Sequence, residues 1–232
     1  MAMEPHQKII NTVAKATLAP RGFFRKGSSR IWLQDNGWYL TVVEFQPSSY
    51  SKGTYLNVAM HFLWGHPIPG EAHFLSLDYG DRLMPPDVPK QFVQYNGDEV
   101  LFAQQVERMA EAAVKRAAEY RRCTDLAYAK NMICAGEPII AGWYEYDRAM
   151  LCFLSGDAED GLRHLQYFTQ TRQHWGWYRE LGMWKICEHE IPERCNTSES
   201  ARQYVIGQIQ SNRAQLLTQA SYKGLRSAAF NG

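Results

Sequence analysis

Three histidines lie close enough along the sequence to suggest a metal site. His61 and His73 fall on two expected strands, and His66 falls on the loop between them. Three imidazoles could bind zinc if this hairpin brought them together. Their spacing is irregular and no carboxylate stands beside them, so we predict no metal and no cofactor. A second group lacks the paired spacing of structural zinc sites and is interpreted in the same way: Cys187, His189 and Cys195.

A polar face of one expected strand offers a second kind of chemistry. Tyr55, Asn57 and His61 occupy alternate positions and therefore point to the same side of that strand. With Glu44 from a neighbouring strand, they could line a pocket for a small ligand or for the substrate of an enzyme. A hydrogen-bonded sheet face explains the same pattern. No serine or cysteine has a spacing that would pair it with a histidine as a nucleophile, so the sequence does not favour an enzyme.

Aromatic and basic residues are unusually dense between residues 172 and 184. Tryptophan, tyrosine and arginine are the residue types that anchor protein interfaces. The same types also fill the space between a helical layer and a sheet, and the sequence leaves both interpretations open. The candidate binding residues of this segment are Trp175, Trp177, Tyr178, Arg179 and Trp184, with Tyr55, Asn57 and His61 as the second choice.

A basic stretch near the N-terminus could suggest binding of phosphate or nucleic acid. Residues 22–27 place two glycines around Arg25 and Lys26, but the phosphate-binding pattern GxxxxGK[ST] is missing and two phenylalanines fill the segment. The chain has 25 Lys and Arg against 24 Asp and Glu, which gives a net charge of +1. This balance argues against a nucleic-acid partner, and a charged strand edge explains the basic residues.

The composition is typical of a globular protein with a buried core, because 45% of the 232 residues are hydrophobic and 21% are charged. No apolar run is long enough to span a bilayer, and we find no pattern of a secretory signal at the N-terminus. The five cysteines are an odd set without a CxxC pair, which favours reduced thiols over a disulfide-bonded secreted protein. We therefore expect a cytoplasmic protein that does not enter a membrane.

The first half of the sequence predicts a helix followed by an antiparallel sheet. Apolar residues recur at helical spacing from Glu4 to Leu18, before Pro20 ends that helix. Turn residues and period-two alternation then predict four strands, at Ile31–Gln34, Trp38–Gln46, Thr54–Trp64 and Ala72–Asp78. Three prolines exclude a helix in Leu83–Gly97, which we interpret as a crossing loop.

After residue 97 the periodicity becomes helical. Asp98 has the residue type of an N-cap, and the helix after it should reach at least Arg121 and pack across the sheet. Further helical stretches are expected at residues 137–154, 158–171 and 198–220. We predict an α+β protein with an N-terminal helix, a four-stranded antiparallel sheet and four or five C-terminal helices. The sheet part should cover residues 1–97 and the helical part residues 98–232, packed together as one body.

Several short blocks of the first third resemble a bacterial protein family. The blocks are Pro20–Gly27, Ile31–Trp32, Val42–Ser51 and Tyr55–Val58. Together, over residues 5–80, they resemble the N-terminal half of the family filed as domain of unknown function 4304. The resemblance implies an α+β fold and a bacterial origin. It implies no activity, because that family has no established function, although some of its members stand among toxin-immunity loci.

These observations favour a non-enzymatic protein that binds another protein inside the cell. The resemblance adds the expectation of an inhibitor of the toxin-immunity type. The alternative is an enzyme or a small-ligand-binding protein with a pocket between the sheet and the helices. A deep concave site at Tyr55, Asn57 and His61 would favour that alternative.

Overall fold

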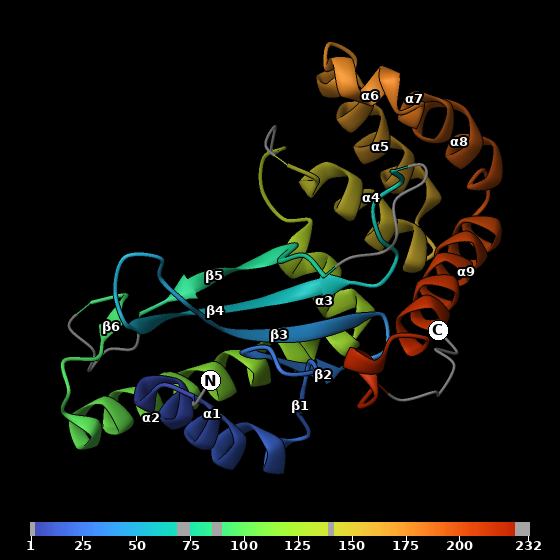
Figure 1. Ribbon diagram of the computed structural model, residues 1–232. Coiled ribbons are helices and arrows are strands. Elements are labelled where there is room, and N and C mark those ends of the chain that lie inside the picture. Colours follow the sequence, from blue (N-terminus) through green and yellow to red (C-terminus); the bar gives the residue numbers. More distant parts are fainter. Residues whose placement is uncertain (1–2, 69–74, 85–89, 139–141, 226–232) are drawn as a thin grey trace. The chain divides into compact units, whose positions relative to one another are not determined.

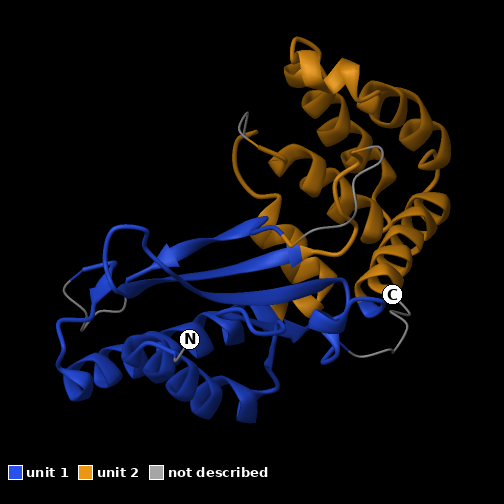
Figure 2. Cartoon of the chain, viewed as in Figure 1, with its two compact units in different colours: residues 1–61, 76–121, 217–227 blue, residues 62–75, 122–216, 228–232 orange. Residues whose placement is uncertain are grey.

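The structure is a computed structural model that describes residues 3–68, 75–84, 90–138 and 142–225. The chain divides into two compact units (Figure 2). Unit 1 contains residues 1–61, 76–121 and 217–227, and unit 2 contains residues 62–75, 122–216 and 228–232. In the described residues, no helix combines the length and the apolar character needed to cross a membrane.

Unit 1 is built on the antiparallel sheet that the sequence predicts. The strands are β1 (Phe24–Arg25), β2 (Ile31–Asp35), β3 (Tyr39–Gln46), β4 (Gly53–Phe62) and β5 (Tyr79–Leu83), hydrogen-bonded in the order β1-β2-β3-β4-β5, while β6 (Val93–Gln94) pairs with the start of β4. The tight β2–β3 turn forms at the expected place, where the Asp35 carboxylate accepts a hydrogen bond from the Gly37 amide at 3.0 Å.

The sheet differs from the sequence prediction at its edges. The short strands β1 and β6 were not expected, because two residues are too few to show a periodicity. The predicted strand Ala72–Asp78 is wrong where it can be checked: residues 72–74 lie outside the described residues, and residues 75–78 are not in a strand. The strand beside β4 is β5, whose exposed centre carries no alternation of apolar residues.

Two helices cover one face of this sheet, α1 (Pro5–Leu18) and α2 (Glu99–Arg121) (Figure 1). The helix α2 begins where the sequence predicts, since the Asp98 carboxylate accepts a hydrogen bond from the Leu101 amide at 2.9 Å. Its far end is tied to the sheet by the Tyr39 hydroxyl, which donates to the Tyr120 carbonyl at 2.6 Å. Apolar side chains of both helices are fully buried, among them Ile10, Ala14, Leu18, Phe102, Val106 and Met109.

The division into units therefore differs from the expected boundary at residue 97. The helix α2 belongs to unit 1 with the sheet, whereas residues 62–75 belong to unit 2. Two hydrogen bonds hold residues 63 and 64 to unit 2. Trp64 Nε1 donates to Asp147 Oδ1 at 2.9 Å, and Asn212 Nδ2 donates to the Leu63 carbonyl at 3.0 Å. A change of periodicity shows where helices begin, but it does not show which elements they pack against.

Unit 2 is helical. Its helices are α3 (Leu126–Ile133), α4 (Tyr144–Leu154), α5 (Ala158–Arg172), α6 (Gly176–Glu180), α7 (Met183–Lys185), α8 (Ile191–Arg194) and most of α9 (Ser198–Leu217), with a π-helical turn at Ile186–Glu190. The helices α4 and α5 correspond to two of the expected helical stretches, and Asp157 caps α5 by accepting a hydrogen bond from the Asp160 amide at 3.2 Å. The helix α4 begins later than predicted, because Gly142 just before it has a φ of +56° that a helix interior does not allow.

The close approach of α4 and α5 predicts the effect of one substitution. A Cβ atom on Gly161 in α5 would lie 2.3 Å from the Phe153 ring in α4. We expect Gly161→Ala to lower the free energy of unfolding by about 1–3 kcal/mol, because the two helices must separate. Urea unfolding followed by circular dichroism measures this change.

The matched control is Gly207→Ala in α9. No atom lies within 4 Å of a Cβ at that position, so alanine should leave stability unchanged or raise it by about 0.4–1 kcal/mol. Equal effects of the two alanines would contradict the close packing of α4 against α5.

Candidate functional site

The candidate site is an apolar surface on the segment after α5, formed by Trp175, Trp177, Leu181 and Trp184 and called here the aromatic surface. The Trp177 side chain is 37% exposed and the Leu181 side chain is 41% exposed. They stand four residues apart on one turn of helix and so share a face. Trp175 and Trp184, which precede and follow them in the sequence, are partly buried. The apolar side chains of Trp177 and Leu181 thus meet solvent.

Ring contacts within unit 2 support the Trp175 and Trp177 side chains of the aromatic surface. The Trp177 ring lies 4.9 Å from the Trp175 ring and 6.0 Å from the Trp143 ring, measured between centroids. The Trp143 ring in turn stacks on the Phe168 ring at 5.3 Å. The buried guanidinium of Arg172 lies 3.9 Å from the centroid of the Trp175 ring. These contacts hold the exposed rings in one arrangement.

The sequence left open whether the aromatic and basic residues of this segment lie in the core or at the surface, and the answer differs between residues. Tyr178 belongs to the core: it is fully buried, its hydroxyl donates to Glu188 Oε1 at 3.3 Å, and burial raises its pKa. Arg179 is exposed, and its Nε donates to the Gln173 carbonyl at 3.2 Å. Leu181, which the sequence analysis did not select, joins the exposed set because it follows Trp177 by one helical turn.

The second candidate region lies on the sheet of unit 1, where Asn57 is the centre of a polar network. Its Nδ2 donates to Glu44 Oε2 at 2.8 Å and to Gln46 Oε1 at 2.9 Å. From β5, Arg82 donates to Asn57 Oδ1 at 3.2 Å and to Gln46 Oε1 at 2.6 Å, and its guanidinium lies 4.0 Å from the centroid of the Tyr55 ring. Arg82 was missed because the pairing of β5 with β4 could not be foreseen. Gln46 ends the predicted strand Trp38–Gln46, but its contact with Asn57 depends on how β3 lies beside β4.

A hollow of about 480 Å³ adjoins this network. Its lining includes Glu44, Gln46, Asn57 and Arg82. His61 does not line the hollow: it is 1% exposed, and its Nδ1 lies 3.1 Å from both Asp78 Oδ2 and Ser76 Oγ. The structure thus brings Glu44, Asn57 and Tyr55 together, and it places His61 in the interior with a carboxylate partner.

The histidines considered for a metal site have separate partners. His66 belongs to unit 2, where it stacks on the Trp143 ring at 4.3 Å and approaches Asp147 Oδ1 at 3.6 Å. His73 lies outside the described residues. Of the second group, Cys187 and Cys195 are buried and His189 is exposed, and the described residues do not bring these three ligand atoms together.

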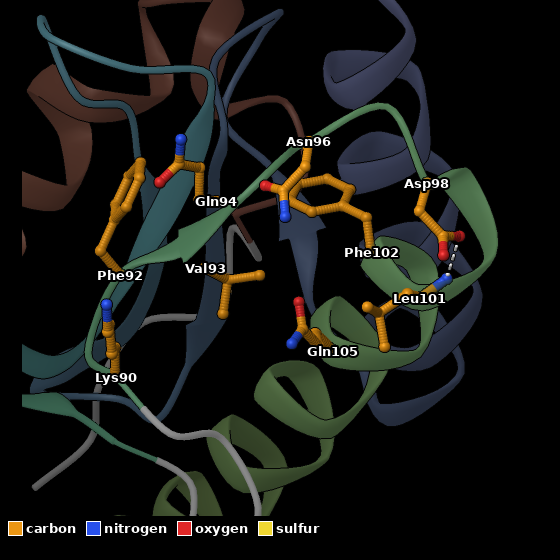
Figure 3. A pocket seen from close by; sticks show the side chains of 9 residues that line it. All are labelled: Lys90, Phe92, Val93, Gln94, Asn96, Asp98, Leu101, Phe102 and Gln105. Atoms are coloured by element: carbon orange, nitrogen blue, oxygen red, sulfur yellow. Dashed lines mark hydrogen bonds between the residues drawn. The ribbon is translucent and has the colours of Figure 1, made fainter.

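A further hollow of about 390 Å³ lies beside the start of α2 (Figure 3). Val93 and Phe102 give it an apolar floor, and the amides of Gln94, Asn96 and Gln105 give it polar sides. The carboxylate of Asp98 at its edge already caps α2. This hollow was not predicted, because the segment before α2 was interpreted as a connecting loop only.

The environments of the cysteines predict which thiol reacts first. Burial raises the pKa of Cys123 to about 11 and the pKa values of Cys187 and Cys195 to about 12. Cys134 is only partly buried, and its hydrogen bond with Cys152 lowers its pKa, while the pKa of Cys152 is raised.

We therefore expect iodoacetamide to alkylate Cys134 first in the reduced, folded protein with a chelator present, because the thiolate is the reactive form. Mass spectrometry of timed digests measures the order. Faster modification of Cys187 or Cys195 than of Cys134 would contradict these environments.

Comparisons of the chain with models of protein families, with curated proteins and with solved structures found no match. The function is therefore inferred from the geometry of the chain itself.

Proposed function

We propose that this chain is a non-enzymatic protein-binding module, and that the aromatic surface of Trp175, Trp177, Leu181 and Trp184 contacts the partner. The observation that carries the proposal is the position of Trp177, which stays 37% exposed while its ring rests on other aromatic rings. An exposed tryptophan beside an exposed leucine leaves apolar area in water that a partner can bury.

The support beneath Trp177 favours binding for a second reason. Binding residues that are already ordered lose little conformational entropy when a partner arrives. The ring contacts with Trp143 and Trp175 provide that order. Arg179 and Glu180 are exposed next to the apolar patch and can form the polar rim of an interface.

The proposed location in the cell follows from the thiols. The proposed kind of partner follows from the resemblance of the N-terminal third to domain of unknown function 4304. In the described residues no disulfide joins any of the five cysteines, which suits the reducing cytoplasm. The resemblance to a family with members among toxin-immunity loci makes an inhibitory partner protein our first choice. The net charge of +1 gives no reason to choose a nucleic-acid partner.

Affinity capture from cells that encode this chain tests the proposal. Trp177→Ser should weaken capture of the specific partner by about 30-fold or more, because an anchoring tryptophan contributes about 2 kcal/mol or more to an interface. Tyr50→Ser is the matched control, since Tyr50 is an exposed aromatic side chain of unit 1. Unchanged capture by Trp177→Ser would overturn the proposal.

The polar hollow of unit 1 supports a second candidate function, the binding of a small polar ligand. Here the favouring observation is the convergence of Glu44, Asn57 and Arg82 beside a volume of about 480 Å³. A fragment screen by ligand-observed NMR tests it. Fragments that bind the wild type should lose binding in Arg82→Gln, and equal binding to both proteins would exclude the hollow.

A further inference from the structure

Two cysteines and a histidine converge in unit 2, outside both candidate regions. Within the described residues, a ligand atom from each of Cys134, Cys152 and His164 lies within 4.8 Å of the other two. The Sγ atoms of Cys134 and Cys152 are 3.9 Å apart. A disulfide needs about 2.05 Å. Two thiolates that share a tetrahedral zinc ion at about 2.3 Å stand about 3.8 Å apart, close to the observed separation.

Three helices supply these groups, and a buried arginine fixes their spacing. Cys134 ends α3, Cys152 lies in α4 and His164 lies in α5. Arg148, also in α4, donates to the carbonyls of Ile133 and Ala135 at 3.0 and 3.1 Å. Because these carbonyls flank Cys134, the arginine holds this cysteine beside α4. The fold thus brings the ligand residues together on neighbouring elements.

The histidine has the kind of carboxylate partner that metal-bound histidines usually have. His164 Nδ1 lies 2.7 Å from Glu145 Oε2, and the carboxylate of Glu145 is buried. A carboxylate on one ring nitrogen fixes the tautomer and leaves Nε2 as the free electron-pair donor. Arg148 pairs with the other carboxylate oxygen at 2.8 Å and so fixes the orientation of the Glu145 carboxylate.

The charged groups around the cluster are paired with one another, so a divalent cation bound to two thiolates does not disturb the charge balance. Glu145 is balanced by Arg148, and Asp157 and Asp160 are balanced by Lys130 and Arg163. A Zn²⁺ ion with two cysteine thiolates and a neutral imidazole adds no net charge to this environment. Two sulfur ligands and one nitrogen ligand favour zinc over magnesium or calcium, which prefer oxygen.

We propose that Cys134, Cys152 and His164 bind one Zn²⁺ ion, with Glu145 as the carboxylate that orients His164. Three protein ligands occupy three of the four tetrahedral positions, and the fourth takes water or an external ligand. The ion joins α3, α4 and α5, and it therefore stabilises unit 2.

Cobalt titration of the reduced, metal-stripped full chain tests this site. We expect one Co²⁺ per chain, with the absorption of thiolate-to-cobalt charge transfer and of four-coordinate cobalt, and displacement by one equivalent of Zn²⁺. Cys134→Ser and Cys152→Ser should each weaken binding by more than about 100-fold, and Glu145→Gln by about 10–100-fold. Cys123→Ser should bind as the wild type does, because Cys123 stands outside the cluster.

A second measurement on the wild type decides the question even if a variant fails to fold. One equivalent of Zn²⁺ should protect Cys134 and Cys152 from alkylation and raise the midpoint of thermal unfolding. Cobalt binding without charge-transfer absorption, alkylation unchanged by zinc, or full binding by folded Cys134→Ser would each overturn the proposal.

Discussion

Replacement of Arg148 by methionine is expected to lower the free energy of unfolding by about 3–5 kcal/mol. The guanidinium is almost fully buried, pairs with Glu145 at 2.8 Å and donates to the carbonyls of Ile133, Ala135 and Glu137. Methionine fills much of the volume but leaves a buried carboxylate without its counter-charge. The same change leaves three carbonyls without this donor. Urea unfolding of the metal-stripped protein, followed by far-ultraviolet circular dichroism, measures the loss.

The matched control is Arg163→Met. Arg163 also pairs with a carboxylate three residues away, that of Asp160, but its side chain is largely exposed. An exposed pair of this kind contributes about 0–1 kcal/mol. If Arg163→Met cost as much as Arg148→Met, burial would not be the reason for the importance of Arg148.

Replacement of Phe168 by alanine is the second change with a large expected effect. Phe168 is fully buried and its ring contacts those of Trp143, Tyr146 and Tyr178. Removing it opens a cavity beneath these rings, and the expected loss is about 3–5 kcal/mol. Urea unfolding followed by circular dichroism measures it without relying on tryptophan fluorescence.

Comparison of Phe168→Ala with Trp177→Ala tests whether Trp177 is a core residue or a surface residue. Trp177 keeps more than a third of its side chain in water, so its truncation should cost about 1 kcal/mol or less. A loss as large as that of Phe168→Ala would mean that Trp177 is a core residue. The proposed interface would then have no exposed anchor.

The strands that could be predicted were the long ones. Trp38–Gln46, rich in aromatic and β-branched residues, and Thr54–Trp64, which alternates, correspond to β3 and β4 with ends shifted by one or two residues. Both strands are largely buried, so apolar residues mark them in the sequence. The residues of β5 are mostly exposed, so no pattern marks them, and Arg82, a partner of Asn57, remained hidden.

For the candidate sites, the sequence likewise does not show which side chains are buried and which are exposed. The aromatic density around Trp177 is visible in the sequence, but only packing separates buried Tyr178 from exposed Leu181. Two carboxylates of α4 contact different partners, which the sequence does not show: Glu145 meets His164, and Asp147 meets Trp64.

The cluster proposed to bind zinc had no signal in the sequence. Cys134 and Cys152 are 18 residues apart on separate helices, without the short paired spacing of known zinc motifs. They meet because Arg148 fixes the end of α3 against α4, a contact that depends on the folded backbone.

Site-specific photo-crosslinking tests the central claim most directly. A photoreactive benzoyl-phenylalanine replaces Trp177 in one protein and Tyr50 in a control, because both positions carry exposed aromatic side chains. On irradiation in the cells that encode the chain, we predict one crosslinked partner protein from position 177 and none from position 50. The same product from both positions, or none from position 177 with the protein folded, would contradict the account.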